Sequence, residues 1–336
     1  MMRYTTLLAT SLLVCLICTL NVFAIENKKM PDTPIQPPFL KIGDTVAIVA
    51  PAGIIKPKRA KVISNAEKLL KSWGLHVWVG RHVLAQNGHF AGTDQQRCED
   101  FQYAMNTPAI KAIWCARGGY GSVRILDMLD YTQFLKHPKW IIGYSDITAF
   151  HCKMNTLGVA TMHALMATSL EGTTNDITES LTTFKKALFG EELTYTIPPS
   201  EYNIPGDITG ELVGGNLTLL SNMLGSDTSI NTNGKILFFE EIGEYAYVID
   251  RMLQSLKRAG YFENCKGIIV GDISKVKYNT TYFGKNVYEL ILDVVREYHI
   301  PVLFDFPSGH EPDNRAIIFG KKIALHIADD KCTVEF

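Results

Sequence analysis

Residues 141–148 (IIGYSDIT) pass from an apolar run into a small polar residue, Ser145, and then into a predicted helix. A strand that ends in a tight turn lifts a serine hydroxyl off the sheet, and the next helix points its first free N–H groups at any oxyanion formed there. The match to G-x-S-x-G is incomplete because Ile147 stands in place of the second glycine. Ser145 is therefore a candidate nucleophile, and the alternative is that Ser145 or Asp146 only caps the helix.

A serine nucleophile needs a base within hydrogen-bond reach, and the base needs a carboxylate to orient it. His310 stands apart from the other histidines because it follows an apolar strand in the loop FPSGHEP, where a glycine permits a sharp turn. Glu240 and Glu241 follow the apolar run 236–239, and a carboxylate at the end of a buried strand is unfavourable unless it is paired. The alternatives are an ordinary loop histidine and a solvated strand edge.

A glycine-rich loop, residues 117–121 (RGGYG), joins a predicted strand to a predicted helix. Its glycines let backbone N–H groups approach a ligand closely, which suits either a phosphate cradle or an oxyanion hole. The spacing is not that of G-x-G-x-x-G, and no Lys-Ser/Thr pair follows. A plain tight turn fits the pattern equally well.

The overall composition narrows the classes of partner. The 336 residues are enough for two domains, and 33 basic against 34 acidic residues give a net charge of -1. This balance provides no basic stripe for phosphate neutralisation, so nucleic acid is not an expected partner. The cysteines after residue 24 contain no C-x-x-C pair and predict neither a zinc site nor a disulfide framework.

Residues 1–24 are typical of a secretory signal peptide. Arg3 precedes an apolar run at 7–24, and Val22 and Ala24 occupy the minus-three and minus-one positions of a small-residue cleavage site. Residues 25–40 contain several prolines and are predicted to be a linker. We therefore expect an exported, periplasmic protein with no stable membrane insertion after cleavage. A membrane-anchored or a cytoplasmic protein is the alternative.

After the linker, apolar runs alternate with helical periodicity, and Thr93 opens one helix in the style of a capping box. This alternation predicts a mostly parallel sheet covered by helices on both faces. The predicted strands are 45–49, 76–79, 112–116 and 140–142, and the predicted helices lie near 63–73, 93–105, 123–129 and 147–154.

The pattern weakens over 171–205, which we predict to connect an amino-terminal α/β domain (41–170) to a carboxy-terminal domain (206–336). The second half has short apolar strands separated by turns, and this texture predicts a smaller, β-rich α/β domain. Its predicted strands are 210–213, 236–239, 267–270, 302–304, 317–319 and 322–327, with helices near 216–224, 248–258 and 287–298.

Several motif blocks together resemble the LD-carboxypeptidase family of serine peptidases, which includes muramoyltetrapeptide carboxypeptidases and, as relatives, microcin-immunity hydrolases. Blocks that occur in the right order are far more specific than any single one. The blocks are APAG at 50–53, FAGTD at 90–94, RGGYG at 117–121, GYSD at 143–146, GELVGGNLTLL at 210–220, FEEIGEYAYVIDRML at 239–253 and GH at 309–310.

The resemblance implies a triad in which Ser145 is the nucleophile, Glu240 the orienting acid and His310 the base. It also implies that the backbone N–H groups of Gly119 and Asp146 form the oxyanion hole. The implied fold is a flavodoxin-like (class I glutamine amidotransferase-like) amino-terminal domain with a swivelling, β-rich α/β carboxy-terminal domain, and the site lies between them. Family members are commonly homodimers, so a homodimer is expected.

The implied activity is that of a serine L,D-carboxypeptidase, which removes the terminal D-alanine from murein tetrapeptides through an acyl-enzyme, without a metal or other cofactor. We predict substrate contacts at Arg117, Tyr120 and Asn216, with Arg117 as the candidate for binding the free carboxylate of the murein peptide. Two alternatives stay open. One is an immunity-type hydrolase of peptidyl-nucleotide toxins, and the other is a murein-peptide binding protein without turnover.

Overall fold

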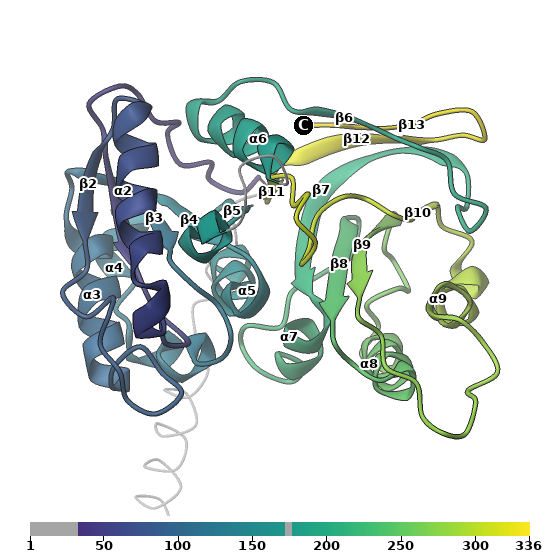
Figure 1. Ribbon diagram of the computed structural model, residues 1–336. Coiled ribbons are helices and arrows are strands. Elements are labelled where there is room, and N and C mark those ends of the chain that lie inside the picture. The colour runs from purple at the N-terminus through teal and green to yellow at the C-terminus, as the bar shows by residue number, and fades with distance from the viewer. Residues whose placement is uncertain (1–32, 172–176) are drawn as a thin grey trace, which may run out of the picture. The chain divides into compact units, whose positions relative to one another are not determined.

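A computed structural model describes residues 33–171 and 177–336 (Figure 1). Thr33–Phe336 forms one compact unit. The predicted signal peptide and the first part of the predicted linker lie outside the described residues. In the part that the structure covers, no helix is long and apolar enough to cross a membrane.

The first sheet is built almost entirely from the amino-terminal half of the chain. Its strands lie in the order β11-β5-β4-β3-β1-β2, and all neighbours are parallel except β11, which pairs antiparallel with β5. Five of these strands were predicted close to their observed positions, although β11 was expected in the second domain, whereas β5 was not predicted. The strands are β1 (Thr45–Val49), β2 (His76–Val79), β3 (Ile110–Cys115), β4 (Trp140–Gly143), β5 (Thr161–His163) and β11 (Ile317–Phe319).

Helices cover both faces of this sheet, as the alternating pattern predicts (Figure 1). Val46 and Ile48 of β1 face a core that includes α2 (Lys61–Ser72) and α6 (Thr178–Phe189). Ala47 and Val49 point the other way, into a core with α3 (Asp94–Asn106) and α5 (Thr148–Thr156). Period-two burial of an all-apolar strand is therefore what fixes the two helical layers.

The second sheet combines parallel and antiparallel strands in the order β10-β9-β8-β7-β12-β13-β6. β7 to β10 are parallel neighbours, and the remaining pairs are antiparallel. The strands are β6 (Thr194–Ile197), β7 (Gly206–Asn216), β8 (Ile236–Ile242), β9 (Gly267–Ser274), β10 (Val302–Leu303), β12 (Lys322–Ile327) and β13 (Cys332–Glu335).

One face of the parallel part packs on α7 (Leu217–Asn222), α8 (Ala246–Arg258) and α9 (Val287–Val295) (Figure 1). The opposite face shares its apolar core with the first sheet, because Phe238 of β8 and Trp114 of β3 belong to the same buried cluster. The two sheets are thus joined by a continuous core.

Local sequence signals predicted the start of α3 correctly, but they failed for the segment 122–128. The predicted capping box is confirmed, since Thr93 Oγ1 accepts from the Gln96 N–H and the Gln96 side chain accepts from the Thr93 N–H. The helix predicted near 123–129 is wrong, because the chain forms two 3₁₀ turns, Ser122–Arg124 and Leu126–Met128. Gly121 at φ +133° starts the first turn, and the segment is too short to propagate an α-helix.

Two strands, β6 and β11, pair with strands from another of the predicted segments of the chain. β6 lies inside the stretch 171–205 and pairs in the second sheet, and β11, from the last part of the chain, pairs in the first. In the linker, the Ile35 N–H donates to the Gly158 carbonyl and the Trp140 indole donates to the Pro38 carbonyl. We keep the domain limits of 41–170 and 206–336 as a proposal.

Candidate active site

Ser145 lies at a strained turn between β4 and α5. Its φ is +62°, a left-handed conformation that is rare for a side chain with a Cβ. Gly143 precedes it at φ +157°, and a Cβ at Gly143 would lie 2.8 Å from Ile147 Cγ1. The turn is therefore specified by close packing of the Ile147 side chain against the backbone at Gly143. Neither Ser145 nor Asp146 caps the helix, so the capping alternative fails.

The Ser145 hydroxyl is the first member of a hydrogen-bonded chain of three side chains. Ser145 Oγ lies 3.0 Å from His310 Nε2, and His310 Nδ1 lies 2.7 Å from Glu240 Oε2. With the proton on Nδ1, the imidazole donates to Glu240 and its Nε2 accepts from the serine hydroxyl. This is the arrangement that lets an imidazole remove the serine proton while a carboxylate fixes the ring.

Glu240 comes from the carboxyl end of β8 and is completely buried. The pairing of β8 with β9 shifts register between Phe239 and Glu241, and such an irregularity redirects the side chain at its centre. Oε1 of Glu240 has no hydrogen-bond partner within the described ranges, so the contact of Oε2 with His310 is the main compensation for its burial.

His310 lies in a loop that follows β10, and neighbouring side chains hold the backbone on either side of it. The Gly309 N–H donates to Asn314 Oδ1 (3.1 Å), and the Glu311 N–H donates to Asp272 Oδ2 (3.2 Å). The edge of the ring also meets Tyr144, with centroids 5.0 Å apart. Both the loop backbone and the imidazole are therefore positioned.

The pKa of His310 reflects two opposed influences. Burial lowers it, but the hydrogen bond and charge of Glu240, with the charges of Glu241 and Asp272, outweigh burial and raise the pKa above its ordinary value. The environment therefore favours the imidazolium, which is the form produced when the serine proton is taken up.

A direct contact between the start of α5 and the end of β7 brings the serine turn to Glu240. Thr148, three residues after Ser145, accepts a hydrogen bond from the Asn216 N–H at 2.9 Å. A Cβ at Gly215 would lie 2.4 Å from Thr148 Cγ2, so only glycine permits this approach. Asn216 is in turn the parallel neighbour of Glu240. This docking explains the glycine at position 215 of the GELVGGN block.

Glu241, the second carboxylate after the apolar run of β8, has contacts that are typical of a structural residue. Its Oε2 accepts from the Thr218 N–H (2.8 Å) and the Thr218 hydroxyl (2.7 Å), while Oε1 accepts from the Ile242 N–H. Burial raises its pKa, opposed by the Thr218 hydrogen bonds. Glu241 therefore ties β8 to α7 and does not contact the serine.

The two predicted oxyanion donors lie on neighbouring loops. A Cβ at Gly118 would lie 3.3 Å from both Ser145 Cβ and the Asp146 nitrogen, so the glycine loop packs directly on the serine turn. Gly119 is exposed at φ +98°. The Asp146 side chain accepts from the Ser122 N–H at 2.8 Å, and burial raises its pKa. This bond braces the helix start against the end of the loop.

The three predicted substrate contacts differ in their freedom to meet a ligand. Arg117 is half-buried and donates to the Ile54 carbonyl, and burial lowers its pKa. Tyr120 is 48% exposed. Asn216 is buried and caps α7, because its Oδ1 accepts from the Leu219 N–H while its Nδ2 faces Glu241 Oε1 at 3.4 Å. Arg117 and Tyr120 thus belong to the glycine loop, whereas the amide of Asn216 makes its hydrogen bonds inside the protein.

Asp272 and Asn314 were missed by sequence reasoning. Asp272 follows buried residues at the carboxyl end of β9, which is the same signal that singled out Glu240, so it could have been found. Asn314 accepts from Gly309 and Ser308, and no local pattern predicts those contacts. His163, behind Tyr144, is completely buried, and burial holds its pKa well below the ordinary value.

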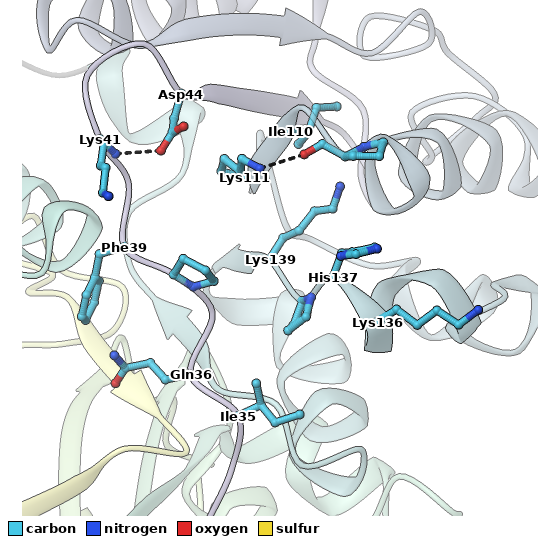
Figure 2. A pocket seen from close by; sticks show the side chains of 13 residues that line it. Ile35, Gln36, Phe39, Lys41, Asp44, Ile110, Lys111, Lys136, His137 and Lys139 are labelled. Atoms are coloured by element: carbon cyan, nitrogen blue, oxygen red, sulfur yellow. Dashed lines mark hydrogen bonds between the residues drawn. The ribbon is translucent and has the colours of Figure 1, made fainter.

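A basic cavity of about 590 Å³ lies elsewhere, beside the amino ends of β1, β3 and β4 (Figure 2). The ammonium groups of Lys111 and Lys139 donate to backbone carbonyls near the end of α3, at Pro108 and Ala104. Because Ser145 follows the carboxyl end of β4, this cavity lies away from the serine. It is lined by Ile35, Gln36, Pro38, Phe39, Lys41, Asp44, Pro108, Ile110, Lys111, Lys136, His137, Pro138 and Lys139.

The possible metal ligands and the cysteines of the described residues were compared with the requirements of a metal site and of a reactive thiol. In the ranges 33–171 and 177–336, no group of three or more His, Cys, Asp or Glu side chains is placed to hold a metal ion. Cys98, Cys115, Cys152, Cys265 and Cys332 are free and buried. Burial raises the pKa of Cys152 to about 12, as expected for a packing residue.

Two family models match the chain in the order expected from the motif blocks. Residues 46–164 match the LD-carboxypeptidase N-terminal domain, and residues 209–325 match the LD-carboxypeptidase C-terminal domain. The first match contains Ser145, and the second contains Glu240 and His310.

Relatives along most of the chain carry related names. The chain is 36% identical over 304 residues to the probable murein peptide carboxypeptidase of Bacillus subtilis (strain 168), covering 89% of this chain and 94% of that protein. It is 30% identical over 298 residues to the murein tetrapeptide carboxypeptidase of Pseudomonas aeruginosa, covering 84% of this chain and 94% of that protein.

Solved structures share the fold. The muramoyltetrapeptide carboxypeptidase from Oxalobacter formigenes matches with a TM-score of 0.78 at 27% identity, over 87% of this chain and 98% of that one. A mutant of the microcin C7 self immunity protein MccF, in complex with adenosine monophosphate, matches with a TM-score of 0.81 at 22% identity, over 90% of this chain and 99% of that one. The second likeness concerns the fold alone. The predicted α/β class with two domains is confirmed.

Proposed function

The chain belongs to the LD-carboxypeptidase family, and we propose that it removes the terminal D-alanine from murein tetrapeptides as a serine L,D-carboxypeptidase. The observation that carries this proposal is the chain from Ser145 Oγ to His310 Nε2 (3.0 Å) and from His310 Nδ1 to Glu240 Oε2 (2.7 Å). A serine with this base and acid can attack a carbonyl without a metal.

In the proposed reaction, His310 Nε2 takes the proton of Ser145 as Oγ attacks the carbonyl carbon of the L,D peptide bond. The carbonyl oxygen becomes an oxyanion that accepts from the N–H groups of Gly119 and Asp146. When this intermediate collapses, the C–N bond breaks and His310 protonates the amine of the departing D-alanine. Glu240 holds the ring and stabilises the imidazolium at each stage.

The ester that remains joins the shortened peptide to Ser145. Water attacks this ester while His310 takes one water proton, and the second intermediate collapses with return of that proton to Ser145 Oγ. The products are D-alanine and a murein tripeptide, and the enzyme is restored. His310 passes the first proton to the amine of D-alanine and the second to Ser145 Oγ, so no external acid, base or oxidant is needed.

Replacement of Ser145 by alanine tests the proposal. We expect Ser145→Ala to lower D-alanine release from a disaccharide tetrapeptide by about 10⁴-fold or more, because the nucleophile is lost. Ser64→Ala is a matched control, since Ser64 is exposed on α2 and should leave turnover unchanged. Undiminished release by Ser145→Ala, at equal purity and thermal stability, would overturn the proposal.

An immunity-type hydrolase keeps the same triad but takes a different substrate. The likeness to the microcin C7 self immunity protein is one of fold, and residues 1–24 have the pattern of an export signal, whereas such toxins act in the cytoplasm. Parallel assays of one preparation on a murein tetrapeptide and on an aspartyl sulfamoyl adenosine would separate the two substrates. Labelling of Ser145 by a serine-directed probe would in turn exclude a binding protein without turnover.

Export and assembly are further parts of the proposal. The pattern of residues 1–24 supports export to the periplasm, where the enzyme would act on murein fragments or on the wall itself. Fractionation of the native protein, with sequencing of its amino terminus, tests this, and recovery from the cytosol with Met1 retained would contradict it. The family resemblance supports a homodimer, which light scattering of the purified chain would check.

A further inference from the structure

Asp272 contacts the chain on both sides of His310. Its Oδ2 accepts from the Glu311 N–H at 3.2 Å. A Cβ at Gly309, which has φ +152°, would lie 2.9 Å from Asp272 Cβ and 3.2 Å from Glu240 Oε2. Only glycine at 309 lets the loop pass so close to both carboxyl groups. The backbone that carries His310 is thus fitted against Asp272 on one side and Glu240 on the other.

Asp272 and Glu240 reach this loop from adjacent strands. β8 and β9 are parallel, and Asp272 follows Gly271 at the carboxyl end of β9, level with the shift in register beside Glu240. Glu240 is fully buried and bonds the ring, whereas Asp272 is half-buried and bonds the backbone. The two carboxylates therefore have separate contacts with one loop.

We propose that Asp272 is a positioning residue for the base: it holds the backbone on both sides of His310 and places a second negative charge beside the ring, favouring the imidazolium that forms when Ser145 gives up its proton. The inference rests on the proposed serine hydrolase. It differs from the triad because the hydrogen bond of Asp272 goes to the loop backbone and not to the ring or the serine.

The electrostatics around the loop agree with this role. Burial raises the pKa of Asp272 to about 6, opposed by the hydrogen bond from the Glu311 N–H. Asp272 in turn helps to raise the pKa of His310. At neutral pH the carboxylate is therefore charged where it can stabilise the imidazolium. The other titratable groups that face the pair are Glu240 and Glu241 on β8, Glu311 and Asp313 on the loop, Tyr288 on α9, Tyr144 after β4 and His163 on β5.

Three substitutions separate the charge of Asp272 from its hydrogen bond. Asp272→Asn keeps an oxygen that can accept from the Glu311 N–H but loses the charge. Asp272→Ala loses both, and Asp272→Glu keeps the charge. The readouts are the pH dependence of kcat/KM for D-alanine release and, independently of any murein substrate, the pH dependence of Ser145 labelling by a fluorophosphonate probe.

We expect the acid limb of both profiles to move to lower pH in Asp272→Asn, because His310 then loses its proton more easily. The ratio of variant to wild-type rate should rise up to about twofold as the pH falls from 8 to about 6.5, and should return toward one near pH 5, where Asp272 of the wild type is itself protonated. Asp272→Ala should show the same shift together with a several-fold lower plateau, and Asp272→Glu should retain the wild-type limb. Thermal melts show which variants remain folded.

Glu311→Gln is the matched control, because it removes one exposed charge from the same loop without touching the backbone contact. Because solvent screens the Glu311 side chain, the acid limb of the pH profile of Glu311→Gln should stay close to that of the wild type. An acid limb in folded Asp272→Asn that superposes on wild type in both assays would overturn the inference. Absence of wild-type D-alanine release with intact probe labelling would instead refute the proposed function and leave the test of Asp272 in place.

Discussion

The Ser145 turn and the His310 loop are the two halves of the site, and they are held in different ways. The turn is fixed by short-range features, which are the end of β4, Gly143 at φ +157° and the positive φ of Ser145 itself. The loop around His310 has little regular structure of its own and is fixed by the side chains of Asp272 and Asn314.

This difference shows where each half of the chemistry is encoded. A strand, a tight turn and a helix can be specified by neighbouring residues, so the nucleophile is a local feature. The base depends on groups from β9 and from further along the loop, so its position is a property of the folded second sheet. Changes far from Ser145 in sequence should therefore disturb the base more than the nucleophile.

The strongest test of this division asks whether the halves act as one unit. His310→Ala should lower kcat for D-alanine release by about 10⁴-fold or more, comparable to Ser145→Ala, because either change removes the proton transfer. The double variant should be no slower than the worse single variant. If the losses multiply in the double variant, the serine and the histidine act independently. That result would contradict the view that the turn and the loop are two halves of one site.

A smaller effect is expected where the loop loses one of its contacts. Asn314→Ala removes the acceptor for the Gly309 N–H and should lower kcat about 10- to 100-fold, because the base is then poorly placed. The matched control is Asn286→Ala, which removes the cap of α9. Asn286→Ala should lower the free energy of unfolding by about 1 kcal/mol and leave kcat unchanged. Equal effects of the two variants on kcat would contradict a positioning role for Asn314.

Lowering the pH should have opposite effects on the stability contributed by His151, beside the serine turn, and by His310, in the loop. Burial lowers the pKa of His151, whose Nε2 donates to the Gly143 carbonyl before the Ser145 turn, to about 4. Its contribution to stability is present above the ordinary pKa of 6.5 and is lost as the pH falls from there toward 4. For His310, whose pKa is raised, the stabilising contribution is present below 6.5 and is lost as the pH rises through the raised value.

We therefore expect the free energy of unfolding to fall by about 1–2 kcal/mol between pH 7 and pH 5 on account of His151. Urea titrations at several pH values measure this change. His151→Gln should flatten the dependence, whereas His76→Gln, at an exposed position on β2, should not. A variant at 151 that keeps the full wild-type slope would show that other groups cause the acid sensitivity.

The sequence anticipated much of the first sheet because its signals are local and strong. β1 and β2 lie where their apolar runs predicted them, and the capping box at Thr93 is confirmed. Short elements were harder. β5, β6 and β13 were not predicted, because each has only three or four residues and lacks the continuous apolar run that marked the equally short β2 and β11.

By itself, the sequence determined the family and the α/β class, and it singled out Ser145, Glu240 and His310 as residue types suited to acyl transfer. Only the tertiary structure decided that these side chains meet, because Ser145 and His310 are 165 positions apart and their contact depends on Thr148 docking against Gly215. The roles of Asp272 and Asn314 were likewise decided only by the tertiary structure. Their partners are backbone groups of a loop without a repeating pattern, and such contacts exist only once the chain has folded.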